Sequence, residues 1–481
     1  MKRKFVTNLI LLVSLNLLIK PFWVLGIDRT VQNMVGAEEY GLYFALFNFS
    51  MIFNILLDLG ITNYNNRNIA QHTFLLKKHL SNIVGLKLML AVVYTIFSLV
   101  IAAIIGYNKI QFHLLFFLIA NQFLISFTLY LRSNISALQL FRTDSLISVL
   151  DRTLMIILCS VLLFTNITDG VFRIEWFVYA QTIAYVVTAI VTFVIVLSKS
   201  GKINLHVNRR FILVFLKKSY PYALLILLMA FYNRIDSVML ERLLPDPMGK
   251  QEAGIYAQAF RLLDAVAMFG ALVGGLLLPM FSRMIKNREA VSPIVNLAVI
   301  LLFVPSIIIA VSSLLYDREI MELLYHSHIE DSADILGLLM TGFIGIATTY
   351  IFGTLLTANG SIRKLNIMAA GGMVLNISLN LILIPHMFAL GSAIASMVTQ
   401  LATALAQVVI AARIFNLRPS KPFIVKTLSF IGVVIAAGVL STYLGNKALG
   451  YFSLILFSIL SAFYIRLINL HDLYKIVALK E

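Results

Sequence analysis

The feature that most constrains this chain is a series of about 14 apolar stretches, each close to the ~20 residues that a helix needs to cross a bilayer. The stretches cover residues 6–26, 40–61, 81–106, 110–131, 145–166, 174–198, 219–240, 253–280, 293–315, 333–356, 364–385, 388–412, 423–443 and 448–468. The connections between them are too short to hold a separate soluble domain. The sequence therefore predicts an all-α polytopic membrane protein with about 14 transmembrane helices.

Composition excludes the alternatives to a membrane protein. Of the 481 residues, 60% are hydrophobic and 12% are charged, whereas soluble domains have about 45–50% apolar and about 25% charged residues. A soluble enzyme, a secreted domain and a disordered chain do not fit these values. The single cysteine, Cys159, leaves no partner for an internal disulfide. The basic residues 2–4 and the apolar run to Gly26 imitate a signal peptide, but the run is too long, so we expect a retained first span.

Lys and Arg residues gather in alternate connections between the apolar stretches. The chain has 38 Lys and Arg against 22 Asp and Glu, a net charge of +16. With a cytoplasmic N-terminus, most of the 38 basic residues fall in cytoplasmic connections, as the positive-inside rule requires. The alternation persists along the chain, so we expect both termini in the cytoplasm. The positive charge is then an orientation signal, and we expect no nucleic-acid partner.

An internal repeat organises the predicted spans. Ile27-Asp28 and Glu39-Tyr40-Gly41-Leu42-Tyr43, at the start of the second span, match Ile235-Asp236 and Glu252-Ala253-Gly254-Ile255-Tyr256, at the start of the eighth. A spacing of six spans predicts two six-helix lobes with parallel topology, as in transporters built from repeats. We expect an N-terminal lobe at 1–198, a basic interfacial linker at 199–218, a C-terminal lobe at 219–414, and two additional helices with a cytoplasmic tail at 415–481.

Five charged residues fall in the outer half of the predicted spans, where a charge is expensive and usually faces a cavity or the bundle interior. They are Lys20, Arg234, Asp236, Arg261 and Asp264. If the lobes face each other, these groups line one cavity with a net positive charge, which suits an anionic head group. The alternative is that Arg234 with Asp236, and Arg261 with Asp264, form ion pairs that lock helices together.

Other polar groups favour structural roles. Asp58, Lys87, Asp151 and Arg152 lie near the cytoplasmic ends of their spans, where snorkelling and Asp–Lys or Asp–Arg pairing explain them. An acidic outer loop with two histidines, from Glu322 to Asp334, fits a solvated loop better than a metal site. No phosphate-binding Gly-Lys-Ser/Thr loop and no Gly-x-Ser-x-Gly elbow occurs. We therefore expect no cofactor, no metal and no enzymatic activity.

The order of several short stretches resembles a known family. These stretches are Val35–Gly41, Tyr232–Asp236, Ala253–Tyr256 with Arg261–Asp264, Leu278–Arg283, and Ile384-Pro385 with Gly391–Ala393. Together they resemble the polysaccharide transporter branch of the multidrug/oligosaccharidyl-lipid/polysaccharide (MOP) exporter superfamily, the flippases of O-antigen and related lipid-linked oligosaccharides. The resemblance extends over most of the chain.

The resemblance implies two six-helix lobes, a central cavity and alternating access in the bacterial cytoplasmic membrane. It implies an undecaprenyl-pyrophosphate-linked oligosaccharide as substrate, contact with membrane lipids, and glycosyltransferases and a polymerase of the same pathway as partners. Arg261 matches an arginine that the lipid II flippases tie to the diphosphate, and Lys20 fills a position where that family has arginine. Arg261, Arg234 and Lys20 would then hold the diphosphate, while Asp236 and Asp264 tune them or carry a coupling ion.

Two alternatives remain open. A drug/cation antiporter of the same superfamily predicts that carboxylates dominate the cavity, whereas the outer set here is net cationic. A membrane-embedded glycosyltransferase or polymerase predicts a sizeable catalytic loop outside the membrane, which the short connections do not supply. The second predicted span carries Asn48 and Asn54 but no arginine at mid-membrane, which argues against lipid II as the substrate.

Overall fold

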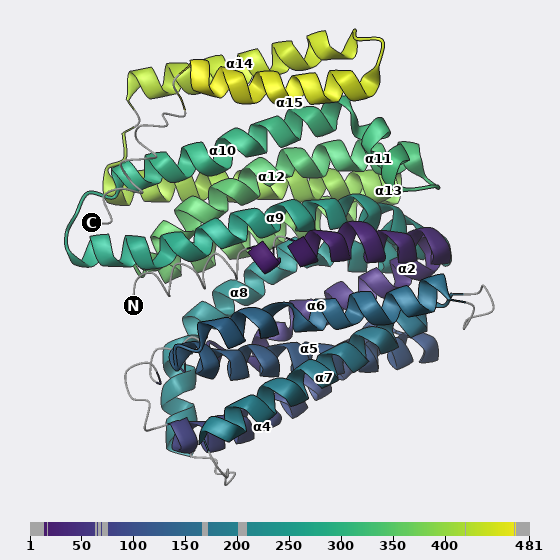
Figure 1. Ribbon diagram of the computed structural model, residues 1–481, viewed down its shortest axis with the longest axis vertical. Coiled ribbons are helices and arrows are strands. Elements are labelled where there is room, and N and C mark those ends of the chain that lie inside the picture. Colours follow the sequence, from purple (N-terminus) through teal and green to yellow (C-terminus); the bar gives the residue numbers. More distant parts are fainter. Residues whose placement is uncertain are drawn as a thin grey trace. The chain divides into compact units, whose positions relative to one another are not determined.

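The computed structural model describes residues 14–16, 18–62, 65, 69, 76–165, 172–200, 209–418, 420–465 and 467. Within these residues the regular structure is helical throughout, with no strand (Figure 1). The elements are η1 (Trp23–Asp28), α2 (Arg29–Ile52), η2 (Asn54–Leu57), α4 (Leu76–Ile105), α5 (Lys109–Ala137), α6 (Phe141–Phe164), α7 (Ile174–Ser200), α8 (Arg209–Leu243), α9 (Met248–Lys286), α10 (Ser292–Leu315), α11 (Asp317–Leu324), α12 (Ile329–Ala358), α13 (Ile362–Phe415), α14 (Lys421–Thr442) and α15 (Lys447–Tyr464).

Eleven helices among the described residues are long and apolar enough to cross a membrane. One of them, α13, has 54 residues and carries two predicted spans, 364–385 and 388–412. Its backbone leaves the helical region at Phe388, where φ is 51°, three residues after Pro385. Proline breaks the hydrogen-bond ladder and clashes with the preceding turn, so the kink falls where the sequence separates the spans. The predicted all-α polytopic membrane fold is confirmed. The start of the first span and most of the expected C-terminal tail lie outside the described residues.

The connection expected between the first two spans is helical over most of its length. The chain is helical from residue 18 through η1 and into α2, and the backbone departs from the helix at Gly36, where φ is 79°. A positive φ is easily reached by glycine and costly for other residues. The helix therefore continues beyond residue 26, the expected end of the first span, as far as Val35.

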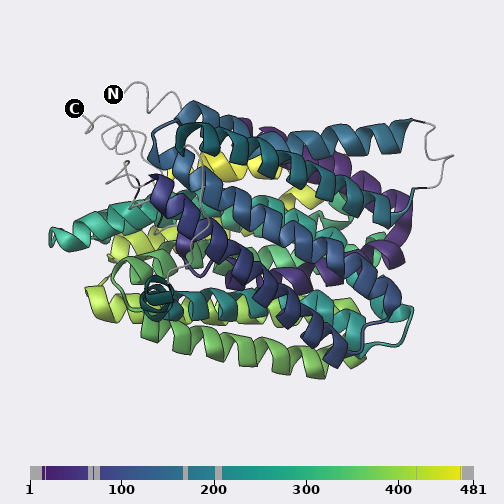
Figure 2. The same cartoon turned by 90° about the horizontal axis from the view of Figure 1, so that it is seen from below.

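The chain packs as two compact units, residues 1–257 and 258–481. In the first unit α5 packs with α7, α2 packs with α8, and α6 packs with α7. Figure 2 shows its long helices running close to one common direction. The buried side chains that join α4, α5, α6 and α7 include Leu80, Tyr130, Ile147 and Val196. Close packing of this kind, and not the hydrophobic effect alone, holds helices together in lipid.

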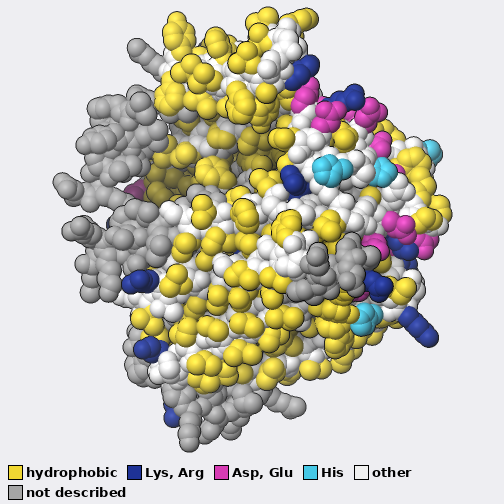
Figure 3. Space-filling view, turned by 45° about the vertical axis from the view of Figure 1, so that its right-hand side comes forward, with side chains coloured by type: hydrophobic (Ala, Val, Ile, Leu, Met, Phe, Trp, Pro, Cys, Tyr) yellow, Lys and Arg dark blue, Asp and Glu magenta, His cyan; other side chains and the backbone are white. Residues whose placement is uncertain are grey.

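In the second unit α12 packs with α13 and α10, and α14 packs with α15 and α10. Val304 of α10, Phe430 and Val434 of α14, and Ala462 of α15 share a buried apolar cluster. Asn108 caps α5, and Ser420 and Asn446 cap α14 and α15, each by accepting a backbone N–H of the first turn. Figure 3 shows apolar side chains over most of the visible surface, with Asp, Glu and His gathered toward its right edge.

The two six-helix lobes, with a linker at 199–218, are expected from the internal repeat in the sequence. This division of the chain stays a prediction. The compact units divide inside α9, after Ala257. α8, which contains the first expected span of the C-terminal lobe, packs on α2 in the first unit. The helix α8 also begins at Arg209, so the later part of the expected linker is continuous with the span that follows it.

Candidate functional site

Arg261 and Asp264 face each other on α9 in the second unit. Their side chains are mostly buried, and Arg261 Nη1 lies 3.8 Å from Asp264 Oδ2. The spacing of three residues puts both on one helix face, as the sequence indicates. One turn earlier, the carbonyl of Gln258 accepts a hydrogen bond of 3.2 Å from the Tyr325 hydroxyl. A distance of 3.8 Å makes this a long ion pair between two residues of the same helix face.

Two glycines further along α9, Gly270 and Gly274, allow a close contact with α12. A Cβ atom at Gly270 would lie 2.5 Å from the Tyr350 ring, and one at Gly274 would lie 3.2 Å from it. The aromatic side chain of α12 therefore lies directly against the backbone of α9. This contact sets the position of the helix that carries Arg261.

Arg234 and Asp236 lie on α8 in the first unit, where each side chain contacts a polar side chain of another helix. Asp236 is buried and accepts a hydrogen bond of 2.9 Å from the Tyr256 hydroxyl. Arg234 Nη1 donates to Asn48 Oδ1 at 3.4 Å, and Asn48 Nδ2 donates to Ser237 Oγ at 2.9 Å. Asn48 of α2 thus bridges two residues of α8, and the pair of helices is joined through polar side chains.

Asp58 and Lys87 form the pair that the sequence predicts. Lys87 Nζ donates to Asp58 Oδ1 at 2.7 Å, to the Leu57 carbonyl at 2.9 Å and to Ser126 Oγ at 2.9 Å. These three partners use all three N–H groups of the ammonium, which is almost completely buried. The carbonyl belongs to η2, where the helix of the second span ends. Lys87 therefore neutralises a carboxylate and satisfies the backbone at a broken helix, which is a structural role.

Lys20 lies further from the end of its helix than the predicted span indicates. Because its helix continues to Val35, Lys20 is about 15 residues from the end of the helix, or roughly 22 Å along it. Asn16 Nδ2 donates to Ser148 Oγ of α6 at 3.0 Å. One turn further along both helices, Lys20 and Arg152 come to the same level. A common level favours one depth for both residues, and the half of the membrane that holds them stays a prediction. Arg152 in turn lies 3.7 Å from Asp151.

Two buried carboxylates are missing from the candidates that sequence reasoning selects. Asp28 is 2% exposed, and the Tyr40 hydroxyl lies 2.9 Å from each of its oxygens. The signal was present, because the repeat matches Asp28 to Asp236. Glu241 is also buried, accepting from Gln111 Nε2 at 2.7 Å and pairing with Arg242 at 2.5 Å. Glu241 lies one residue beyond the predicted end of its span, so the sequence places it in a connection between spans.

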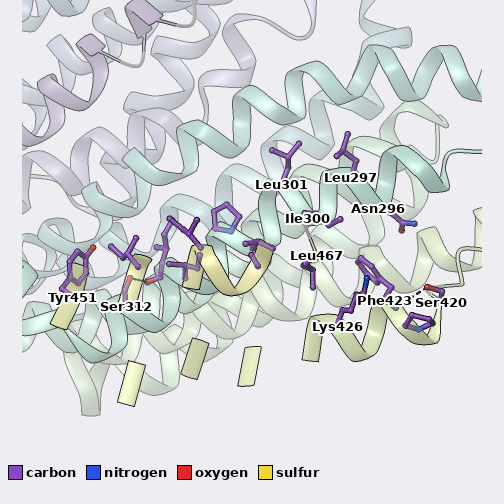
Figure 4. Close-up of a pocket in the computed structure, with 18 residues that line it drawn as sticks. Asn296, Leu297, Ile300, Leu301, Ser312, Ser420, Phe423, Lys426, Tyr451 and Leu467 are labelled. Carbon is purple, nitrogen blue, oxygen red and sulfur yellow. Dashed lines mark hydrogen bonds between the residues drawn. The ribbon is translucent and has the colours of Figure 1, made fainter. Parts of the chain in front are cut away.

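The second unit contains an apolar cavity of about 740 Å³ between α10, α14 and α15. Ile308 of α10 and Ile455 of α15 are among the apolar residues in its wall. Figure 4 shows Tyr451 and Ser312 at one end, and Ser420, Phe423 and Lys426 at the other. Among the described residues, the lining contains one cation, Lys426, and no carboxylate. A long apolar cavity with a cationic end suits an amphipathic anion.

The acidic outer loop contains ion pairs. Arg318 Nε lies 2.9 Å from Glu322 and its Nη1 lies 3.4 Å from Glu330, while His328 lies 3.9 Å from Asp331. Over the described ranges, no three His, Cys, Asp or Glu side chains converge in a way that would hold a metal ion. The predicted loop is largely helical, because Glu322 lies in α11 and Glu330 and Asp331 lie in the first turn of α12.

The sequence model of the family described as "Polysaccharide biosynthesis protein" matches residues 5–285, more than half of the chain. The chain belongs to this family. It is a multi-pass membrane protein, as the sequence predicts. No curated protein sequence matches this family member.

Solved structures share the fold of this family member. Lipid II flippase MurJ in an inward closed conformation superposes with a TM-score of 0.74 at 16% identity, covering 97% of this chain and 100% of that one. An inward-facing multidrug resistance MATE family transporter gives 0.59 at 15% identity, covering 82% and 94%. A MOP superfamily transporter from Pyrococcus furiosus gives 0.57 at 14% identity, covering 85% and 94%. At such identities the likeness establishes the fold alone.

Proposed function

We propose that this protein is a flippase that moves an undecaprenyl-pyrophosphate-linked oligosaccharide across the bacterial cytoplasmic membrane by alternating access. The oligosaccharide would be a repeat unit of O-antigen, capsule or exopolysaccharide. Membership of the polysaccharide biosynthesis protein family supports this proposal, as does the fold shared with a lipid flippase. Glycosyltransferases and a polymerase of the same pathway would supply and consume the substrate.

The observation that carries the proposal is the cavity between α10, α14 and α15. Its walls are apolar over the length that Figure 4 shows, and Lys426 lies at one end. A polyprenyl chain is apolar along its whole length and carries its negative charge at one end. The cavity therefore has the pattern of this substrate class. A cationic drug would meet a lysine and no carboxylate in the described lining, so the antiporter alternative is less well supported.

Arg261 is the proposed diphosphate contact in the second unit. Its side chain is mostly buried within a membrane-spanning helix, and a planar guanidinium bonds two phosphate oxygens at once. Arg234 and Lys20, each in the first unit, stay proposed contacts for the same chemical group. Asp264 would moderate the charge of Arg261. Asp236, held by Tyr256, is a buried carboxylate that would carry a coupling ion.

Filling the cavity tests the proposal. Ile308→Trp and Ile455→Trp each place a large ring in the wall, and we expect less surface polysaccharide per unit of membrane protein. Val425→Trp is the matched control, because that side chain lies on α14, is 61% exposed and is outside the cavity lining. Export at the parental level in both cavity variants would contradict the assignment of the apolar chain to this cavity.

The head-group assignment has its own control on the same helix. Arg261→Gln removes the cation and keeps most of the side-chain volume, so we expect export to fall while the protein level is unchanged. Arg283→Gln removes an exposed cation near the end of α9 and should leave export unaltered. Equal export in the two variants would remove Arg261 from the proposed site.

A further inference from the structure

A second apolar hollow, a groove of about 440 Å³, lies between the two halves of the kinked helix α13 in the second unit. Ser392 Oγ, beyond the kink at Phe388, donates to Asn380 Oδ1 before it at 2.8 Å. Further from the kink, Gln407 Nε2 lies 4.0 Å from Met368 Sδ. These contacts join residues at matching distances on either side of Phe388. The two halves of α13 therefore run antiparallel, with the groove along their seam.

Small residues on both halves produce this groove. Gly371 lines it from the first half, and Ala402 and Ala406 line it from the second. A Cβ atom at Gly371 would meet nothing within 4 Å, so the space beside it is open. Ile367, also in the lining, is 66% exposed, so the groove opens onto the surface of the protein. In a membrane such a hollow is filled by lipid, because an empty one forfeits the dispersion contacts of its walls.

The length of the groove indicates how much of a lipid it holds. Its lining on the first half extends from Lys364 to Leu375, or about 16 Å at the rise of an α-helix. The hydrocarbon core of a bilayer is about 30 Å thick, so one leaflet contributes roughly 15 Å. The groove thus matches the depth of one leaflet. A single acyl chain of a phospholipid fits this length, whereas a long polyprenyl chain exceeds it.

The charge at one end of the groove indicates the kind of head group. Among the described residues of the lining, Lys364 is the one charged side chain. Arg363 and Arg413, at the same end of α13, are exposed cations. The sequence has no Asp or Glu from residue 335 to residue 471, so this part of the chain supplies no carboxylate. Basic pockets between helices at the membrane surface bind anionic lipid head groups, and the sequence predicts this end to be cytoplasmic.

We propose that the groove of α13 binds one acyl chain of an anionic phospholipid, with the lipid phosphate at Lys364. The second acyl chain of the lipid stays in the surrounding bilayer. This inference goes beyond the proposed function, because it assigns a resident membrane lipid to α13, away from the cavity between α10, α14 and α15. Apolar walls hold the chain, and the cation at the end selects a head group with a net negative charge.

Native mass spectrometry of the purified full chain in detergent measures the binding of single lipid molecules. The protein is titrated with phosphatidylglycerol and with phosphatidylcholine that carry the same acyl chains. We expect phosphatidylglycerol to bind about fivefold more tightly or more, since a basic residue near the membrane surface contributes about that factor for an anionic lipid. Lysophosphatidylglycerol, which has one acyl chain, should compete for the same site, because the groove holds one chain.

Two substitutions in the groove separate the contribution of its walls from that of its charge. Gly371→Trp places a ring in the open space and should weaken phosphatidylglycerol binding by about tenfold or more. Gly432→Trp is the matched control, because Gly432 lies on an exposed face of α14 where a Cβ atom also meets nothing within 4 Å. Lys364→Gln should remove most of the preference for phosphatidylglycerol over phosphatidylcholine. Arg363→Gln removes a neighbouring cation outside the lining and should keep that preference.

Three results would overturn the inference, once thermal melting shows that the variants are folded. One is unchanged phosphatidylglycerol binding in Gly371→Trp. Another is equal affinity of the parent protein for the two phospholipids. The third is an equal loss of preference in Lys364→Gln and Arg363→Gln, which would indicate attraction to the basic surface in general. None of these measurements involves transport, so they stand apart from a failure of the proposed function.

Discussion

Gly41 and Gly254, which occupy matching positions of the internal repeat, lie against each other in the first unit. A Cβ atom at Gly41 would lie 2.5 Å from the Gly254 amide nitrogen and would overlap the Lys250 carbonyl oxygen. A Cβ atom at Gly254 would overlap the Ala37 carbonyl oxygen in the same way. The two copies of the repeat therefore meet backbone to backbone. Small residues permit this approach between helices in membranes, and no other side chain fits here.

The first prediction follows from this contact. Gly41→Ala and Gly254→Ala should each destabilise the protein by about 1–3 kcal/mol or more, because the clashing atoms belong to the backbone and have no rotamer to change. The measurement is the melting temperature of the detergent-purified protein. Gly275→Ala on α9 is the control, since its Cβ would meet nothing within 4 Å. There the change should be neutral or stabilising. Equal melting of all three variants would refute the close approach.

The second prediction concerns Lys87. Lys87→Met should destabilise the protein by about 3–5 kcal/mol, because it leaves Asp58 charged and removes the closer of the two donors to the Leu57 carbonyl. The double variant Lys87→Met with Asp58→Asn should recover a large part of this loss, since no charge is then left without its partner. Thermal melting of the single and double variants measures the recovery. A double variant no more stable than Lys87→Met would show that the pair is not the main contribution of Lys87.

Apolar length predicted the spans well, because membrane crossing depends on a property that each stretch carries by itself. The Asp58–Lys87 pair was also predictable, since the two residues lie near the same end of adjacent spans. The extension of the first helix to Val35 was not. Asp28 and neighbouring polar residues indicate a loop, and only the contact with Tyr40 shows how the carboxylate is accommodated within a helix.

The predicted depth of Lys20 depends on where that first helix ends. With the helix ended at residue 26, Lys20 lies in the outer half, but a helix that continues to Val35 places it level with Arg152. The packing of α8 on α2 could likewise not be predicted from the sequence. The repeat records which segments are related, whereas packing depends on contacts such as Asn48 with Ser237, which no repeat reveals. The sequence thus identifies the charged residues of the candidate site, but it does not show which side chains contact them.

The third prediction concerns the hairpin of α14 and α15. Tyr316, between α10 and α11, donates from its hydroxyl to Ser441 Oγ at 2.8 Å. A Cβ atom at Gly450 would meet the Ser441 carbonyl at 2.7 Å and would also overlap the Tyr316 hydroxyl. Gly450→Val should therefore loosen the hairpin. We expect faster hydrogen exchange in α14 and α15 and unchanged exchange in α12. Gly432→Val, on an exposed face of α14 with nothing within 4 Å, should leave exchange unaltered. Equal hydrogen-exchange rates in α14 and α15 of the Gly450→Val and Gly432→Val variants would contradict this contact.

The fourth prediction concerns the pH dependence of α11, which lies outside the predicted spans. Burial raises the pKa of the Asp317 carboxyl above its ordinary value of 3.8, and the negative charges of Asp334 and Glu319 add to the rise. A raised pKa means that the folded protein holds this proton more tightly than the unfolded chain. Stability should therefore fall as the pH rises from 3.8 through the raised pKa, and the penalty should persist at neutral pH.

Asp317→Asn tests this sign. The amide cannot ionise, yet its oxygen can still accept the hydrogen bond of 2.7 Å from the Arg318 backbone N–H. We expect the variant to melt above the parent at neutral pH, with the gap narrowing as the pH falls toward 3.8. Asp331→Asn, at an exposed carboxylate 3.9 Å from His328, is the control and should not reproduce this gap. A gap that widens on acidification would show that Asp317 stabilises the fold as an anion, against the sign argued from its burial.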